Sequence, residues 1–107
     1  MERMQAFWNA HAHWSRATFG DDSKRGPIGA LKHLEKEARE AQEPGHDAYE
    51  IVDCFLLTID AARRSGMSYD EFVELAETKL EINKTRKWPI PVDDTPVEHI
   101  REYLANP

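Results

Sequence analysis

Residues 48–65 contain the stretch YEIVDCFLLTID (49–60), whose apolar side chains surround nearly the whole circumference of a helix. A helix that is apolar on all sides is normally buried among other helices. Three acids nevertheless interrupt the stretch, at Glu50, Asp53 and Asp60, and burying a carboxylate without a cation or strong hydrogen-bond donors is costly. The segment therefore predicts a helix inside a helical assembly, with acids that meet cations in the interior or in a cleft.

The rest of the chain also favours helices. Apolar residues at helical spacing, separated by turn formers, predict helices over residues 3–16, 27–42, 48–65 and 68–87 and a short last helix from Thr95. Asp47 is the expected N-cap of the third helix, and Ser68 with Glu71 forms a capping box for the fourth. No segment shows strand alternation. We therefore expect an all-α fold, one domain over residues 1–107, in which four or five helices form a bundle completed by oligomerisation.

Composition narrows the class of protein. A chain of 107 residues with 40% hydrophobic and 32% charged residues suits one small soluble domain. Its net charge of −6 argues against binding of polymeric DNA or RNA, although cations could still bridge its acids to a small phosphorylated ligand. Cys54 is the only cysteine, and neither a signal-peptide core nor an apolar run of membrane-spanning length is present. We therefore expect a cytoplasmic protein without disulfides or membrane contact.

Two pairs of acids have the spacing that places both carboxylates on one helix face. Glu50 and Asp53 form one pair, and Glu37 and Glu40 form the other. The tight turn between their helices predicts an antiparallel hairpin in which the two pairs face each other. Four carboxylates in such a frame would suit Mg²⁺ or Mn²⁺.

A simpler interpretation exists for some of these acids. An E-x-x-E pair on a charged helix is usually solvated, and that interpretation would be preferred for Glu37 and Glu40 taken alone. The apolar surroundings of the other pair favour a metal site when both pairs are considered together. Asp60 could support the metal ligands, but an ion pair with Arg63 or Arg64 is the simpler interpretation.

The fourth predicted helix carries a stripe that begins apolar and ends cationic. Lys79, Asn83 and Arg86 lie within a narrow arc of it. The two cations could hold phosphate oxygens and Asn83 could contact a sugar or base, but pairing with surface acids explains the spacing equally well. Trp14 is a candidate for stacking on a base, although aromatic residues in so small a chain more often belong to the core or a subunit interface.

The acid pairs also resemble a known family. EARE (37–40) followed by EIVD (50–53) is similar to the paired E-x-x-E and E-x-x-D motifs of the all-α nucleoside triphosphate pyrophosphohydrolases, the MazG-like group. The segments 14–20, 33–37, 60–66 and 79–89 resemble the compact phage branch of dATP/dGTP diphosphohydrolases, and within it the MazZ type. The resemblance covers residues 14–89. Two features depart from the family pattern: Lys36 replaces the first of a doubled glutamate, and the gap over residues 41–49 is short.

The resemblance implies a reaction and a cofactor. Such enzymes hydrolyse the bond between the α- and β-phosphates of a nucleoside triphosphate and release the monophosphate and pyrophosphate. A purine deoxynucleotide, dGTP foremost, is the implied substrate. The implied cofactor is Mg²⁺, for which Mn²⁺ can substitute, held by Glu37, Glu40, Glu50 and Asp53. Either Glu37 or Glu40 would orient or deprotonate the attacking water.

The resemblance also implies partners. Lys79 and Arg86 would steady the phosphates, as cations do in phosphoryl transfer. Relatives assemble as dimers or dimers of dimers, and the apolar third helix with Val97, Ile100 and Leu104 of the last helix would support a homo-oligomer here. A phage protein of this kind would act in the cytoplasm of its host.

Two functions of other classes stay open at this point. A non-catalytic helical dimer could act as an adaptor, in which case the acids should pair with Arg and Lys. A nucleotide-binding sensor would bind the triphosphate without turnover. The cationic stripe over residues 79–86 slightly favours the enzyme, because an adaptor has no need of it.

Overall fold

The computed structural model describes residues 2–101, and its regular structure is helical. Four helices follow one another along this part of the chain: α1 (Arg3–Phe19), α2 (Ile28–Ala41), α3 (Ala48–Arg64) and α4 (Tyr69–Thr85). Lys87 and Ile100 form an isolated antiparallel bridge. The expectation of an all-α fold is confirmed. In the described residues, no helix is both long and apolar enough to cross a membrane.

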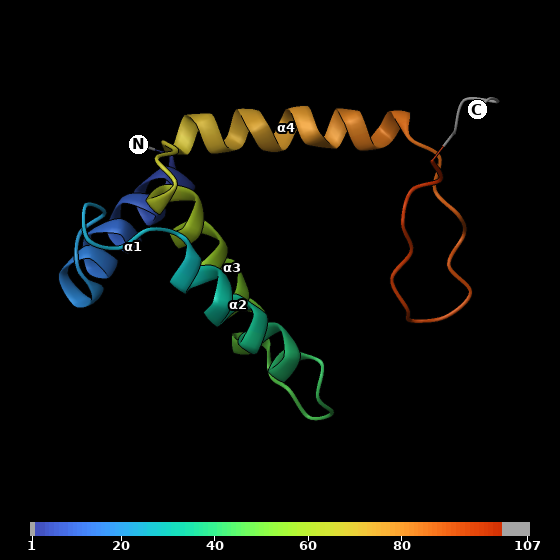
Figure 1. The fold of residues 1–107 in the computed structure, drawn as a ribbon, viewed down its shortest axis with the longest axis horizontal. Coiled ribbons are helices and arrows are strands. Elements are labelled where there is room, and N and C mark those ends of the chain that lie inside the picture. Colours follow the sequence, from blue (N-terminus) through green and yellow to red (C-terminus); the bar gives the residue numbers. More distant parts are fainter. Residues whose placement is uncertain (1, 102–107) are drawn as a thin grey trace. The chain divides into compact units, whose positions relative to one another are not determined.

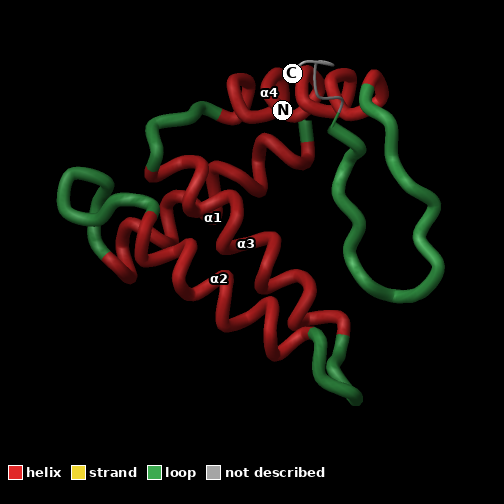
Figure 2. The backbone as a smooth tube through the Cα atoms, turned by 45° about the vertical axis from the view of Figure 1, so that its right-hand side comes forward, coloured by secondary structure: helices red, strands yellow, loops and turns green. Residues whose placement is uncertain are grey.

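The chain divides into two compact units, residues 1–72 and 73–107. In the first unit α2 and α3 form the expected antiparallel hairpin, and the two helices lie side by side in both views of the backbone (Figures 1 and 2). α1 packs against α3. The second unit contains most of α4 and the segment that follows it.

Local signals in the sequence explain where the helices begin. The Asp47 carboxylate accepts a hydrogen bond from the backbone N–H of Glu50 at 3.2 Å, so the expected N-cap of α3 is confirmed. Ser68 Oγ accepts from the Glu71 N–H at 3.1 Å, and Glu71 Oε1 accepts from the Ser68 N–H at 3.4 Å. These two bonds are the predicted capping box of α4. α1 runs three residues beyond its predicted end.

The core of the first unit is small. Trp8 of α1 is buried with Ile59 and Ala62 of α3, and Phe72 packs against this cluster at a ring distance of 5.5 Å from Trp8. Only the second half of α3 is buried, however, and Ile51, Val52 and Phe55 are about half exposed. In the single chain α1 and α2 cover only part of the circumference of α3, so the expectation that oligomerisation completes the bundle around this helix stays a prediction.

The predicted last helix is also wrong over the described residues 95–101, where the chain is not helical. The Thr95 side chain does not cap a helix, because its hydroxyl donates to the Asp93 carboxylate, which also accepts from the Thr95 N–H at 3.1 Å. Ile100 instead lies in the bridge with Lys87. Leu104, assigned to the same helix, lies outside the described residues.

Candidate functional site

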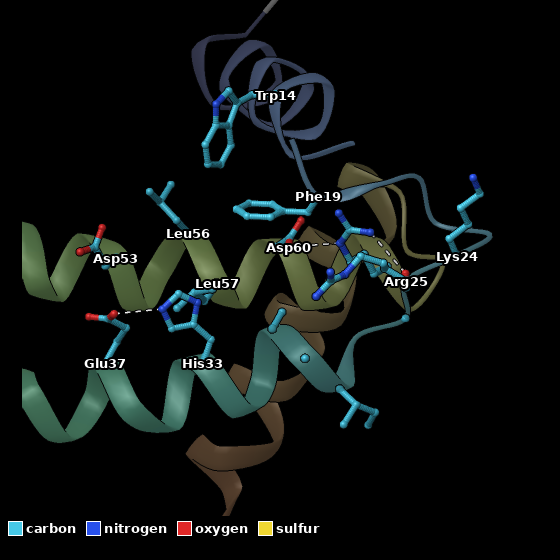
Figure 3. A pocket seen from close by; sticks show the side chains of 15 residues that line it. Trp14, Phe19, Lys24, Arg25, His33, Glu37, Asp53, Leu56, Leu57 and Asp60 are labelled. Carbon is cyan, nitrogen blue, oxygen red and sulfur yellow. Dashed lines mark hydrogen bonds and ion pairs between the residues drawn. The ribbon is translucent and has the colours of Figure 1, made fainter. Parts of the chain in front are cut away.

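A cavity of about 600 Å³ lies in the first unit, between the α2–α3 hairpin, the end of α1 and the loop that leads into α2 (Figure 3). Fifteen residues line it: Trp14, Phe19, Lys24, Arg25, Gly26, Ile28, Gly29, Ala30, His33, Glu37, Asp53, Leu56, Leu57, Asp60 and Arg64. Its wall combines aromatic and aliphatic side chains with a few converging charged groups, as ligand sites usually do.

One acid from each predicted pair faces this cavity. Glu37 rises from α2 toward α3, and Asp53 lies on the facing α3 (Figure 3). The Glu37 side chain is only 16% exposed, and its Oε1 lies 3.1 Å from His33 Nε2. The antiparallel hairpin thus brings two carboxylates that are sixteen residues apart in sequence to one site.

The other two acids of the pairs do not line the cavity. Glu50 Oε2 is buried and, within the described residues, has no hydrogen-bond partner. A buried carboxylate oxygen of this kind needs a cation or a donor, which fits a metal ligand. Glu40 is 49% exposed and lies 3.9 Å from Lys36. Across residues 2–101, no three His, Cys, Asp or Glu side chains are grouped closely enough to hold an ion, so the four-carboxylate ligand set stays a prediction.

Asp60 has a different environment from these acids. Its Oδ1 accepts from Ser15 Oγ at 2.8 Å and from Arg63 Nη2 at 2.5 Å, and its Oδ2 accepts from Arg64 Nε at 3.2 Å. Burial raises the pKa of Asp60, but these hydrogen bonds and the arginine charges outweigh it, so the pKa lies below its usual value. The simpler interpretation of Asp60, an ion pair with the arginines that follow it, is confirmed.

Aromatic side chains form another part of the cavity wall. The Trp14 and Phe19 rings meet edge to face, with centroids 5.4 Å apart and planes at 89°. Trp14 is 54% exposed and points into the cavity (Figure 3). It is therefore not a core residue of the single chain, and its predicted role in stacking on a base stays a prediction.

The cationic stripe predicted to bind phosphates belongs to the second unit. Arg86 Nη1 donates to Asn83 Oδ1 at 3.3 Å, and Lys79 is exposed. Glu81, a surface acid close to these cations in sequence, pairs with Lys84 at 3.0 Å. The roles of Lys79, Asn83 and Arg86 at the site stay predictions.

Sequence reasoning did not assign His33 or Arg64 to the site. The spacing of four residues between His33 and Glu37 on one helix is the signal that could have connected them. The spacing of four residues indicated the pairing of Arg64 with Asp60, but not its contacts with Ser15, Gly20 and Arg25, which lie at least 39 residues away in sequence.

Known proteins are similar to this chain in sequence and in fold. A family model described as dATP/dGTP pyrophosphohydrolase matches residues 7–106. The Eaa protein of Salmonella phage P22 is 54% identical over 93 residues, which is 86% of this chain but only 28% of that protein. A solved MazG-like pyrophosphohydrolase of cyanophage S-2L, bound to dGDP and three catalytic Mn²⁺ ions per active site, is 29% identical with a TM-score of 0.69, covering 92% of this chain and 95% of that one. The chain therefore belongs to the dATP/dGTP pyrophosphohydrolase family, in its MazG-like phage branch.

Proposed function

We propose that this chain hydrolyses deoxynucleoside triphosphates between the α- and β-phosphates, releasing the monophosphate and pyrophosphate, with dGTP preferred. The observation that carries the proposal is the cavity of the first unit, which holds Glu37 and Asp53 on facing helices beside the exposed ring of Trp14. The cyanophage neighbour, which carries dGDP and three catalytic Mn²⁺ ions, supports the same class of ligand here.

Divalent metal, Mg²⁺ or Mn²⁺, would be held by Glu37, Glu40, Glu50 and Asp53. It would neutralise phosphate charge and lower the pKa of a bound water. The unpartnered oxygen of Glu50 supports this ligand set. Within residues 2–101, neither Glu50 nor Asp53 forms an ion pair with an arginine or lysine, which supports it as well. A non-catalytic adaptor would instead pair all four acids with cations. Glu40 lies 3.9 Å from Lys36, but within residues 2–101 Glu50 and Asp53 have no such partner, which supports the enzyme.

The chain's own residues would bind and orient the substrate. Glu37 or Glu40 would accept the proton of the attacking water, and the contact with His33 Nε2 holds Glu37 in one orientation for that role. Trp14 would lie against the base, while Lys79, Asn83 and Arg86 would contact phosphates and sugar. We also propose that both units act as one catalytic domain, since the family model spans them, and that copies assemble as a dimer or dimer of dimers in the host cytoplasm.

Product analysis tests this function. The purified chain is incubated with Mg²⁺ or Mn²⁺ and each of the four deoxynucleoside triphosphates, and the products are separated by ion-exchange chromatography. We expect monophosphate and pyrophosphate, with dGTP consumed fastest and no reaction after chelation. If all four triphosphates stay intact, the nucleotide-sensor and adaptor functions take precedence.

Substitution of the carboxylates tests the ligand set. We expect Glu50→Gln and Asp53→Asn each to lower kcat by more than about 100-fold while circular dichroism shows unchanged helix content, since each removes a charge that the metal requires. Glu35→Gln is the matched control, because Glu35 lies on the same hairpin, 65% exposed and paired with Arg39. Near-normal rates in either site variant would show that these acids do not bind the catalytic metal.

A further inference from the structure

Two arginines at the end of α3 are buried, although arginine side chains are seldom fully buried without a partner. The exposed fractions of the Arg63 and Arg64 side chains are 4% and 2%. Neither takes part in the chemistry proposed above. Their guanidinium groups lie instead beneath the loop of residues 20–25, which connects α1 to the segment that leads into α2.

Arg64 joins both ends of this loop. Its Nη1 donates to the carbonyl oxygen of Gly20 at 3.1 Å and to that of Arg25 at 3.3 Å. Its Nη2 donates to Ser15 Oγ at 2.9 Å and its Nε to Asp60 Oδ2 at 3.2 Å. The planar guanidinium thus fixes the loop to α1 and α3 at once, which a lysine ammonium could not do.

Arg63 holds the middle of the same loop. Its Nη1 donates to Asp22 Oδ1 at 2.5 Å, and its Nη2 donates to Asp60 Oδ1 at 2.5 Å. Burial raises the pKa of Asp22, but the hydrogen bonds from Arg16 and Arg63 lower it by more. The pKa therefore lies below its usual value, and the carboxylate is charged at neutral pH. The loop is therefore attached to α3 at residues 20, 22 and 25.

Two cations of the loop, Lys24 and Arg25, are among the residues that line the cavity. The Lys24 ammonium points away from Trp14 and His33 (Figure 3). Gly20 has a φ of +104°, which favours glycine, and a Cβ added there would lie 3.7 Å from Arg25 Cδ. A Cβ added at Gly29 would lie 3.4 Å from Arg25 Nη2. The Arg25 side chain is thus placed between the end of α1 and the first turn of α2. Within residues 2–101 neither cation forms an ion pair with an acid.

We propose that Arg64, with Arg63, is a positioning residue for the substrate: it fixes the loop so that Arg25 can donate hydrogen bonds to oxygen atoms of the nucleotide. The inference rests on the function proposed above. Two oxygen sources share this chemistry, the phosphates and the O6 atom of guanine, since arginine binds both well. Lys24 contributes charge at the same wall.

A double-mutant cycle tests the inference. We expect Arg64→Lys to raise KM about tenfold, as expected for the loss of about one charge-assisted hydrogen bond, and to change kcat by less than about threefold. Arg25→Gln should raise KM similarly. The double variant should have a KM no higher than the worse single variant, because Arg64 acts through Arg25. Arg39→Lys is the matched control, since Arg39 is 75% exposed and pairs only with Glu35.

The two oxygen sources give different results in the same experiment. If Arg25 binds phosphate, both single variants raise KM equally for dGTP and dATP. If Arg25 binds O6, KM rises for dGTP alone. Fold-changes that multiply in the double variant, or a KM for Arg64→Lys within twofold of wild type, would overturn the inference while leaving the proposed function intact.

Two results would change the experiment: a variant that does not fold and a wild-type chain without activity. If circular dichroism shows that Arg64→Lys does not fold, Asp22→Ala, which removes the acceptor of Arg63 from the loop, replaces it in the cycle with the same expectation. If the wild-type chain hydrolyses no triphosphate, the proposed function fails, and the cycle is run on the dissociation constant of dGTP with Mn²⁺ by calorimetry. A wild-type chain that neither hydrolyses nor binds dGTP overturns both proposals.

Discussion

Glu50 and Asp60 lie on the same helix, yet their carboxylates have opposite surroundings. Asp60 accepts hydrogen bonds from Ser15, Arg63 and Arg64, whereas Glu50 has a buried oxygen without a partner among the described residues. A buried carboxylate with three donors is expected to contribute to stability, and one without a donor is expected to bind a ligand. We therefore expect a structural role for Asp60 and a ligand-binding role for Glu50.

The pH dependence of stability should report on Asp60. Because its pKa is lower in the folded chain than the unfolded value of about 3.9, its contribution is complete above that value and is lost as pH falls through the lowered pKa. We expect Asp60→Asn to lower the free energy of unfolding at pH 7 and to flatten its decrease below about pH 4. Urea unfolding over pH 2–7 measures both. If the free energy of unfolding falls equally steeply below pH 4 in Asp60→Asn and wild type, this assignment is contradicted. Glu35→Gln is the control.

At the scale of the element, the N-cap of α3 connects stability to the site. Asp47 caps the turn that contains Glu50, and its charge also interacts favourably with the positive end of the helix dipole. Fraying of this turn would release the buried oxygen of Glu50. Local helix stability is therefore expected to affect metal binding.

Replacing the cap tests this connection. We expect Asp47→Ala to cost about 1 kcal/mol of stability and to weaken Mn²⁺ binding, because the first turn then opens more often. Asp47→Ser is the control, since serine also caps helices and should retain most of both properties. Thermal unfolding and a Mn²⁺ titration give the two values. Unchanged Mn²⁺ affinity in Asp47→Ala would show that Glu50 does not depend on this turn.

At the scale of the whole molecule, the core is too small to cover the apolar residues of α3. Tyr49, Ile51, Val52 and Phe55 are exposed in the single chain, and contiguous exposed apolar residues of this kind mark an interface. Trp8, Ile59 and Ala62 are the main buried cluster of the first unit. A second copy of the chain would cover the rest.

Sedimentation tests assembly. We expect a homo-oligomer, with a mass that is a multiple of 12.4 kDa, and dissociation to monomer with loss of activity in Ile51→Glu or Phe55→Glu. Lys32→Glu adds the same side chain at an exposed polar position of α2 and should leave the mass unchanged. A wild-type mass of one chain would contradict the prediction that oligomerisation completes the bundle.

Local chemistry allowed the sequence by itself to determine the four helices and the N-caps of α3 and α4. Hydrogen bonds of a helix and its caps join residues three or four apart, so Asp47, Ser68 and the apolar spacing already specify them. The last predicted helix failed because Thr95 bonds to Asp93, a local alternative that the capping pattern does not exclude. The E-x-x-E and E-x-x-D spacing likewise identified the four acids as candidate metal ligands without any knowledge of tertiary contacts.

Tertiary structure alone decided which of these groups meet. Glu37 and Asp53 share the cavity while Glu40 pairs with Lys36, because the relative rotation of two packed helices selects which carboxylate faces inward. Apart from Asp60, the partners of the buried Arg64 lie at least 39 residues away, and no local pattern encodes them. Burial and long-range hydrogen bonds depend on the surfaces that pack together, and a sequence pattern describes each surface only by itself.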